Sequence, residues 1–463
     1  MTATLSPLLQ PLRRLRRGRA ATRRRAHPSR ALFVGFALAI ALGATLLMLP
    51  IATESGVSTP FTVALFTATS AVCVTGLIVV DTPEHWSTFG EIVILVLFQV
   101  GGLGIMTAAS VLGLLVSRRF GLRLQLTAHA ERRTLGIADL KRILINVVKI
   151  SLLIEAILTV VLTARLALGH GAPFGEALYT GLFHAVSAFN HAGFSLYSDS
   201  LTRFVSDPWI TVPIMTAVIL GGLGFPVLFE LARNARNPRQ WSLHSKITVL
   251  TTVALLVVGF GAILAVEWSN PDTMGPLGVG GKLLAGLFAS VTSRSAGFNT
   301  VDTAAMEPAT LMVLDVLMFI GGGSGGTAGG IKVTTFALLA FVILAEVRGE
   351  PSVHVMGRRL PAEVQRQALT IALLGVGLVM VSTITLLNMT DYDLDRVLFE
   401  VISAFATCGL STGITGDLPP AGTLLLTALM FLGRLGPITA AAALALRDRP
   451  RKYELPEDRP IVG

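Results

Sequence analysis

The most restrictive feature of this sequence is a series of eight apolar stretches, each long enough to cross a lipid bilayer. They fall at residues 31–52, 91–116, 143–168, 208–230, 247–267, 307–346, 367–388 and 422–445. A span of about 20 apolar residues crosses the hydrocarbon core of a membrane. The 463 residues are 52% hydrophobic and only 14% charged, a balance that does not suit a water-soluble surface. We therefore expect an all-α integral membrane protein with eight transmembrane spans.

The basic residues gather in alternate loops. Most of the 37 lysines and arginines lie in the tail 1–30, the linkers 118–142, 232–246 and 348–366, and the tail 447–463. Cytoplasmic loops carry such an excess, so both termini are predicted to be cytoplasmic. The Arg-rich start is similar in composition to a targeting leader, but no small-residue cleavage site follows the first apolar run. The net charge of +9 then reflects topology and contact with anionic lipids, and nucleic-acid binding is not expected.

A shorter apolar segment lies between the members of each pair of spans. These segments, at 60–77, 174–194, 281–298 and 394–411, each contain Leu-Phe followed nine or ten residues later by a glycine. Each is too short to cross and return, which is typical of a re-entrant helix and loop lining a water-filled cavity. A second glycine mark, at Gly101, Gly221, Gly321 and Gly433, follows 24 to 28 residues later. We predict four pseudo-fourfold helix–pore-loop–helix repeats around one pore, at 31–117, 143–231, 247–347 and 367–446.

Four converging loops of this kind suit a monovalent cation. Backbone carbonyls can replace the water shell of K⁺, and glycine permits the dihedral angles that aim them inward. The C-termini of the short helices add partial negative charge at the centre. No carboxylate lies within the four filter stretches, so divalent cations are not favoured. The carbonyls and the helix dipoles oppose an anion. The predicted K⁺-binding residues are Val74, Thr75, Gly76, His191, Ala192, Gly193, Ser295, Ala296, Gly297, Thr407, Cys408 and Gly409.

Four charged or titratable side chains near these stretches need an interpretation. Arg294 would repel a cation, and we expect it to point behind the filter and pair with a carboxylate. Glu400 and His184 lie on the short helices, where placement toward solvent is expected rather than ion ligation. Lys332 is expected to extend its ammonium group toward the cytoplasmic surface.

The stretches Ala71–Leu77, Ser187–Phe194, Ser293–Thr300 and Ser403–Thr412 resemble the Trk/Ktr/HKT superfamily of K⁺ transporters, and more closely its KtrB-type membrane subunit. The Gly-rich stretch Gly321–Lys332 and the segment around Arg434 resemble it as well. The resemblance implies K⁺ uptake across a bacterial inner membrane, one filter glycine per repeat and a homodimer. It also implies a cytoplasmic nucleotide-binding regulatory ring on another polypeptide. No cofactor beyond the ion is expected in this chain.

Two filter positions bear on which ion is carried. Glycine rather than serine at Gly76 favours K⁺ over Na⁺ by this resemblance. His191 stands where relatives commonly have asparagine, and a protonatable ring there would add pH sensitivity. A Na⁺ or nonselective monovalent cation transporter is the alternative reading. A polytopic membrane enzyme is a further alternative, but it would need paired carboxylates, a His cluster or an activated nucleophile, and the sequence offers no such set.

The third repeat contains an additional feature, seven glycines within ten residues of a predicted span. Each glycine costs a helix roughly 1 kcal/mol relative to alanine, so the span is predicted to be broken by a flexible loop below the filter. The resemblance implies the same, a mobile intramembrane loop that blocks the pore. Arg434 is hypothesised to hold this loop shut by hydrogen bonds to its carbonyls, since a buried membrane arginine needs such partners. The alternative is a structural arginine paired with a carboxylate. The predicted gate comprises Gly321, Gly322, Gly323, Ser324, Gly325, Gly326, Thr327, Ala328, Gly329, Gly330 and Arg434.

Overall fold

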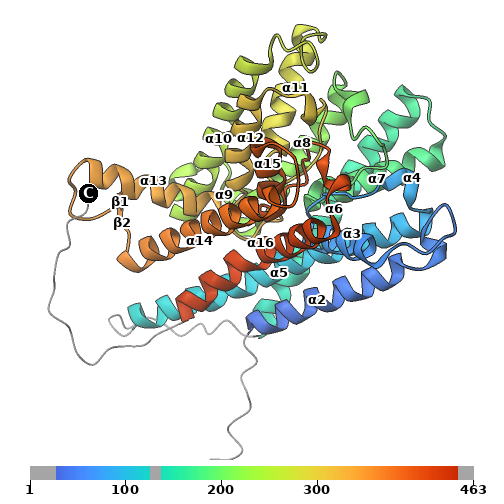
Figure 1. Ribbon diagram of the computed structural model, residues 1–463. Helices are drawn as coiled ribbons and strands as arrows, with labels where there is room; N and C mark the ends of the chain where they lie inside the picture. The colour runs from blue at the N-terminus through green and yellow to red at the C-terminus, as the bar shows by residue number, and fades with distance from the viewer. Residues whose placement is uncertain (1–27, 126–136, 447–463) are drawn as a thin grey trace, which may run out of the picture.

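The computed structural model describes residues 28–125 and 137–446, and these form a bundle of helices (Figure 1). The long helices are α2 (Pro28–Leu47), α5 (Thr88–Gln125), α6 (Ile137–Gly169), α10 (Leu243–Glu267), α14 (Ala362–Leu387) and α16 (Pro420–Leu446). Helix α4 (Thr82–His85) and the 3₁₀ turns η1 (Pro50–Ala52), η2 (Thr202–Phe204), η3 (Pro238–Gln240), η4 (Thr303–Ala305) and η5 (Ile414–Asp417) lie in the connections.

Four short helices coincide with the four segments predicted to be re-entrant. They are α3 (Phe61–Cys73), α7 (Phe174–Asn190), α11 (Val279–Thr292) and α15 (Leu394–Phe405). The phenylalanine of each Leu-Phe pair is completely buried, at Phe66, Phe183, Phe288 and Phe399. Helix α16, at the C-terminal end of the described chain, packs on α2, α3 and α5, at its N-terminal end. The packing therefore closes on itself around the short helices.

Two of the predicted spans are broken. The stretch predicted as one span at 208–230 forms α8 (Pro208–Leu223) and α9 (Phe225–Asn234), which meet at 104°. The bend arises because Gly224 adopts a left-handed φ of 87° and Pro226 occupies the first turn of α9. The Gly-rich stretch separates α12 (Pro308–Phe319) from α13 (Val333–Val347), which confirms the predicted break.

The apolar surface is consistent with a lipid environment. Among the described residues, α5, α6, α10 and α14 are long and apolar enough to cross a membrane, and the bent pair α8–α9 makes a fifth candidate. Helices α2, α12, α13 and α16 are shorter in their described apolar parts. On α10, Leu250, Val257 and Val258 are each more than half exposed. Exposed leucine and valine on a long helix are expected where lipid is the solvent.

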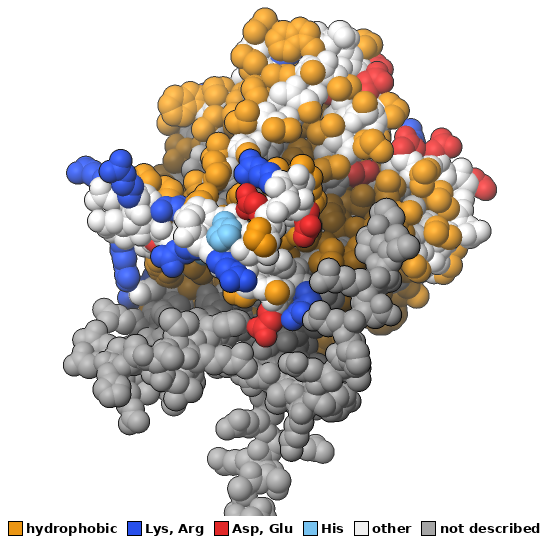
Figure 2. Space-filling view, turned by 90° about the vertical axis from the view of Figure 1, so that its left-hand side faces the viewer, with side chains coloured by type: hydrophobic (Ala, Val, Ile, Leu, Met, Phe, Trp, Pro, Cys, Tyr) orange, Lys and Arg blue, Asp and Glu red, His pale blue; other side chains and the backbone are white. Residues whose placement is uncertain are grey.

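A small hairpin in the linker 348–366 was not predicted. Strand β1 (His354–Val355) pairs antiparallel with β2 (Arg358–Arg359), and Val353, Val355 and Leu360 pack into a second small core with Ile247 of α10. Figure 2 views the molecule from this side and shows Lys and Arg side chains around the hairpin, below a largely apolar surface. Exposed arginines of this face include Arg348, Arg358, Arg359 and Arg366.

Candidate functional site

The site begins where the short helices end. In α3, the Thr75 N–H donates to the Ser70 carbonyl at 2.7 Å and the Val74 N–H donates to the Ala71 carbonyl at 3.0 Å. This pair of bonds is the Schellman motif, which closes a helix through a left-handed residue. The same bonds recur in α7, from Ala192 and His191, and after α15, from Cys408 and Thr407. The three short helices therefore end in the same way.

The backbone that follows alternates in handedness in all four segments. The residue two before each predicted filter glycine has a positive φ, 56° at Val74, 65° at His191, 74° at Ser295 and 48° at Thr407. The glycines have φ of 90°, 73°, 74° and 96°. Among the described residues only two other non-glycine positions, Ser200 and Met356, have positive φ. Each costs roughly 1–3 kcal/mol and persists only where the surroundings enforce it, so this conformation is imposed by the fold.

The four glycines lie side by side in a closed order, which we call the glycine ring (Gly76, Gly193, Gly297 and Gly409). A Cβ at Gly76 would lie 2.5 Å from the Ala192 carbonyl oxygen, and one at Gly193 would lie 3.1 Å from that of Ala296. A Cβ at Gly297 would lie 2.6 Å from the Cys408 oxygen, and one at Gly409 would clash with the Thr75 oxygen. Each glycine therefore lies against a carbonyl of the next segment along the chain, and the glycine of the fourth segment lies against a carbonyl of the first.

The second glycine mark serves close packing behind the ring. A Cβ at Gly101, Gly221 or Gly433 would clash with the carbonyl of the residue four before the ring glycine, in Val72, Phe189 and Phe405 respectively. In the third segment, Gly321 instead approaches the Gly329 carbonyl of its own loop. Gly101, Gly221 and Gly433 let the neighbouring helix pack closely against the end of each short helix. In the third segment the Gly-rich loop begins at this position, with Gly321.

Three serines behind the ring were missed by sequence reasoning, and we call them the inner serines (Ser70, Ser187 and Ser403). Each lies six residues before its glycine, so the recurrence was visible in the sequence. Ser70 accepts from the Gly76 N–H at 3.0 Å and donates to the Leu77 carbonyl at 2.8 Å. Ser187 donates to the Phe194 carbonyl at 2.9 Å, and Ser403 accepts from the Gly409 N–H at 3.0 Å.

The third segment departs from this scheme because its Phe–Gly spacing is one residue shorter. Thr292, which stands four residues after Phe288 as the inner serines do after their phenylalanines, donates to the Phe288 carbonyl of its own helix at 2.9 Å. Ser295 takes over as a contact to its neighbours, donating to the Thr407 carbonyl of the fourth segment at 2.8 Å. Its own carbonyl faces His191 Nδ1 at 2.8 Å, while His191 Nε2 faces the Val218 carbonyl at 2.7 Å. The His191 side chain is therefore directed behind the ring.

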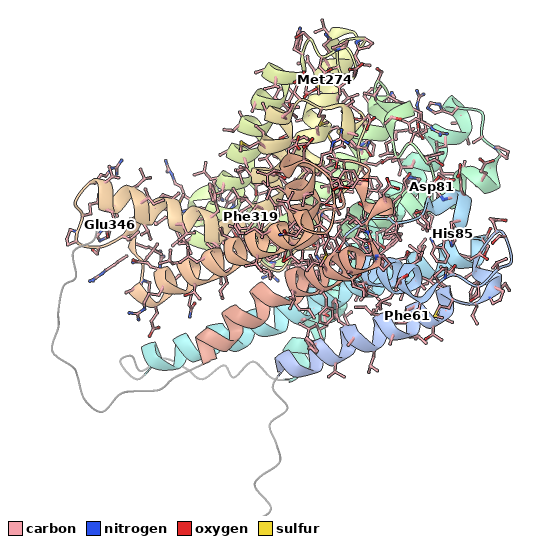
Figure 3. The ribbon with its side chains drawn as sticks, in the orientation of Figure 1. Phe61, Asp81, His85, Met274, Phe319 and Glu346 are labelled. Atoms are coloured by element: carbon pink, nitrogen blue, oxygen red, sulfur yellow. The ribbon has the colours of Figure 1, made fainter. Side chains whose placement is uncertain are left out.

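The Gly-rich loop lies directly against the ring. It follows Phe319, which sits between Glu346 at one end of the molecule and Asp81 and His85 at the other (Figure 3). Within the loop, the Gly329 N–H donates to Ser295 Oγ at 2.8 Å. A Cβ at Gly329 would also clash with Thr407 Oγ1. The loop therefore covers the side of the ring that precedes its glycines.

Two arginines hold this loop through backbone carbonyls. Arg294 Nη2 donates to the Gly321 carbonyl at 3.1 Å, and Arg434 Nη1 donates to the Thr327 carbonyl. The expected carboxylate partner of Arg294 was wrong: no ion pair of either arginine occurs among the described residues. Both guanidinium groups are buried and retain unsatisfied nitrogens. Lys332 Nζ, expected to extend to the surface, instead donates to the Ala328 carbonyl at 2.5 Å.

The bend between α8 and α9 receives the other side of the loop. The Gly323 N–H donates to the Gly222 carbonyl at 2.7 Å and the Thr327 N–H to the Gly221 carbonyl at 3.1 Å. In return, the Phe225 N–H donates to the Gly325 carbonyl at 3.3 Å. The backbone N–H and C=O groups left unpaired at the bend of α8–α9 therefore hydrogen-bond with those of the Gly-rich loop. Irregular backbone is tolerated at membrane depth when its polar groups are satisfied in this way.

Three buried titratable groups surround the segments. Glu155 of α6 accepts from Gln99 Nε2 at 3.0 Å and from Asn190 Nδ2 at 3.2 Å. Glu400 and His184 are 0% and 3% exposed, so their expected placement toward solvent was wrong. The ends of α7 and α15 that carry them are buried at every residue, from Phe183 to Asn190 and from Phe399 to Phe405, which leaves no solvent face there. Outside the ring, the described residues contain no group of three or more His, Cys, Asp or Glu side chains able to hold a metal ion.

Comparison with known proteins identifies relatives along nearly the whole chain. Residues 9–451 match a family model described as TrkH, a cation transport protein. The chain is 38% identical over 425 residues to the Ktr system potassium uptake protein B of Bacillus subtilis, covering 91% of this chain and 94% of that protein. It is 40% identical to the protein of the same description from Vibrio alginolyticus, with 91% of each covered.

Two further matches extend this result. The potassium/sodium uptake protein NtpJ of Enterococcus hirae is 33% identical, with 95% of this chain and 98% of that protein covered. The crystal structure of the potassium transporter TrkH from Vibrio parahaemolyticus shares the fold, with a TM-score of 0.68 at 19% identity. That match covers 90% of this chain and 85% of the other.

Proposed function

This chain belongs to the TrkH family of cation transport proteins, and on that premise we propose that it takes up K⁺ through the glycine ring. The observation that carries the proposal is the ring itself, in which Gly76, Gly193, Gly297 and Gly409 contact one another in cyclic order. The curated relatives described as potassium uptake proteins support K⁺ as the ion. The chain acts as a transporter, and no catalytic residue is assigned.

The alternating backbone explains how the ring would hold K⁺. A chain that alternates between left- and right-handed residues directs successive carbonyls toward one side. Four such stretches around an axis offer the oxygens that replace water around the ion. We assign this role to the carbonyls of Val74–Gly76, His191–Gly193, Ala296–Gly297 and Cys408–Gly409, because the Ser295 and Thr407 carbonyls are engaged by His191 and Ser295. The bonds of the inner serines to ring glycines support this assignment, because they fix the backbone from behind.

The same family membership supports the finer architecture. We propose eight spans arranged as four repeats, with the bent pair α8–α9 and the interrupted pair α12–α13 each crossing once. The repeats are those predicted from the sequence, 31–117, 143–231, 247–347 and 367–446. The basic face around β1–β2 would then be cytoplasmic, with both termini on the same side of a bacterial inner membrane.

The Gly-rich loop is proposed as the gate. Its glycines press on the cytoplasmic end of the ring, and the buried charges of Arg294 and Arg434 beside it would repel a cation that leaves the ring toward the cytoplasm. Movement of the loop would have to break the bonds that these arginines donate to the Gly321 and Thr327 carbonyls. Replacing Arg434 with alanine should raise K⁺ flux by the purified chain severalfold, with exposed Arg396→Ala as the matched control. Unchanged flux in R434A, in protein of normal stability, would count against the gate.

Partners follow from the family rather than from contacts in the structure. We propose a homodimer and regulation by a separate nucleotide-binding ring that docks on the basic cytoplasmic face. The exposed arginines of that face, including Arg348 and Arg359, would also contact anionic lipids.

The proposed function is tested by complementation of a bacterium that lacks K⁺ uptake. Expression of this chain should restore growth at low external K⁺, and vesicles containing the purified protein should accumulate Rb⁺ in competition with K⁺. Na⁺ is the second candidate ion, favoured by the identity with NtpJ, whose description names both potassium and sodium. Equal competition by Na⁺ and K⁺ would replace K⁺ selectivity with nonselective monovalent transport, and absence of Rb⁺ uptake would refute the proposal.

A further inference from the structure

Two buried side chains that the proposed transport does not use occupy the same place in two segments. His184 lies nine residues before Gly193, and Glu400 lies nine residues before Gly409. Both project from a short helix toward the chain that leaves the ring, on the side away from the Gly-rich loop. Each meets a serine two residues after its ring glycine, Ser195 or Ser411. We call Ser195 and Ser411 the mouth serines.

In the fourth segment, Glu400 is completely buried and saturated with donors. Its Oε1 accepts from Ser411 Oγ at 2.5 Å and from the Thr412 N–H at 2.9 Å. Its Oε2 accepts from Thr415 Oγ1 at 2.8 Å. Ser411 Oγ in turn accepts from the Gly413 N–H at 2.9 Å. The carboxylate therefore pins the first turn of chain beyond the ring.

The second segment repeats this arrangement with a different side chain. His184 Nδ1 lies 2.9 Å from the Thr180 carbonyl, which requires a proton on Nδ1. In the neutral ring Nε2 is then the acceptor, and it lies 3.0 Å from Ser195 Oγ. Ser195 Oγ accepts from the Tyr197 N–H at 3.0 Å, and Tyr197, like Gly413, is four residues beyond its ring glycine. Both segments therefore have a side-chain acceptor nine residues before the ring glycine, a serine two residues after it and a bonded backbone N–H four residues after it.

The other two segments lack this arrangement. Ile78 stands at the mouth-serine position of the first segment, and Asn299 stands there in the third, where its amide donates to the Val301 carbonyl. In the cyclic order of the ring, the second segment neighbours the first and third, and the fourth segment does the same. The two arrangements therefore lie diagonally across the ring.

We propose that the pairs His184–Ser195 and Glu400–Ser411 are positioning residues that hold the outer mouth of the filter on two opposite sides and thereby set discrimination between K⁺ and Na⁺. This inference rests on the proposed function. Neither acceptor is a ligand for the ion, because both are buried and their lone pairs are engaged by protein donors. They act through the backbone of Phe194 and Leu410, which lies between each ring glycine and its mouth serine. With that backbone released, the carbonyls can close on the smaller ion.

The test measures ion preference in vesicles containing the purified full-length chain. Rb⁺ uptake, competed by K⁺ and by Na⁺, is compared for the wild type, Ser195→Ala, Ser411→Ala and Glu400→Gln. Each variant should lower the preference for K⁺ over Na⁺ on the order of tenfold, the effect of losing one buried hydrogen bond. Ile78→Ala, at the same position in the first segment, is the matched control and should retain the wild-type preference. Ser411→Thr keeps the hydroxyl and should also retain it.

A double-mutant cycle separates the anchoring role from general damage. Glu400→Gln and Ser411→Ala should be non-additive in the K⁺/Na⁺ ratio, because one weakens and the other removes the same contact between the Glu400 carboxylate and Ser411. Glu400→Gln and Ser195→Ala should add, because they act on opposite walls. A variant that is unstable in detergent is replaced by its milder partner, Ser411→Ala for Glu400→Gln. Unchanged ion preference in folded S195A and S411A overturns the inference. Rb⁺ uptake by the wild-type vesicles tests the proposed function by itself. The further inference is tested by the change in ion preference of each variant relative to the wild type, whichever monovalent cation the wild type carries.

Discussion

Replacing Gly76 with serine is the most direct test of the glycine ring. At Gly76 the backbone has φ of 90°, and a Cβ would lie 2.5 Å from the Ala192 carbonyl oxygen, whereas real Cβ contacts stay beyond 3.0 Å. The Ala192 carbonyl, one of the proposed K⁺ ligands, must therefore move. Leaving a buried ion without one of its acceptors costs roughly 1–3 kcal/mol, which corresponds to a change of about 5- to 150-fold in an equilibrium.

We therefore expect G76S to lower the K⁺ preference over Na⁺ by about 5- to 150-fold, measured as Rb⁺ uptake competed by each ion in vesicles. The matched control is Gly56→Ala. Gly56 also has a left-handed φ, 68°, but a Cβ there would meet no atom within 4 Å. This control carries the backbone strain without touching the ring, so it should lose stability while keeping its ion preference. A folded G76S protein with wild-type preference would refute the ring as the selective element.

Three further predictions concern Ser295 beside the ring, Asp207 at the start of α8 and Gln99 beside Glu155. Ser295→Ala removes the acceptor of the Gly329 N–H, so it should loosen the gate and raise basal Rb⁺ flux severalfold in vesicles; equal flux would show that this bond does not hold the loop. Asp207 caps α8 outside the membrane. Burial alone would raise its pKa, but hydrogen bonds from the neighbouring histidine and arginine lower that pKa below 3.8. Its contribution is thus present at neutral pH and lost as pH falls through the lowered pKa, and D207N should lower Tm at pH 7 more than at pH 3. Gln99→Leu leaves Glu155 without its closest donor, which should cost about 1–3 kcal/mol of stability, read from chemical unfolding in detergent.

The features that the sequence could predict are those written into local backbone requirements. Helix periodicity, Leu-Phe pairs and recurring glycines depend on neighbours a few residues away, so their positions anticipate α3, α7, α11 and α15. The break after Phe319 follows from composition alone, because no helix tolerates that density of glycine without cost.

The features that could not be predicted depend on partners distant in the chain. The carbonyl that receives Arg294 belongs to Gly321, and a sequence shows a buried arginine's need for an acceptor but not which acceptor meets it. The bend at Gly224 reads locally as an ordinary glycine in an apolar run. It becomes intelligible only when the Gly-rich loop supplies donors and acceptors to the exposed turn. Glu400 looked solvated because carboxylates in helices usually are.

The third segment shows why its one-residue deletion is tolerated in an otherwise repeated design. The shorter spacing places Thr292 where the inner serines stand, and because its hydroxyl donates to the Phe288 carbonyl of its own helix, the ring glycine of that segment has no inner serine. Ser295 compensates by bonding both to the fourth segment, at the Thr407 carbonyl, and to the loop, at the Gly329 N–H. The deletion therefore transfers support of the backbone from the segment's own helix to the element proposed to move. Any displacement of the loop removes one of the bonds to Ser295, so gate position and filter geometry are energetically linked, and by reciprocity ion occupancy must bias the gate.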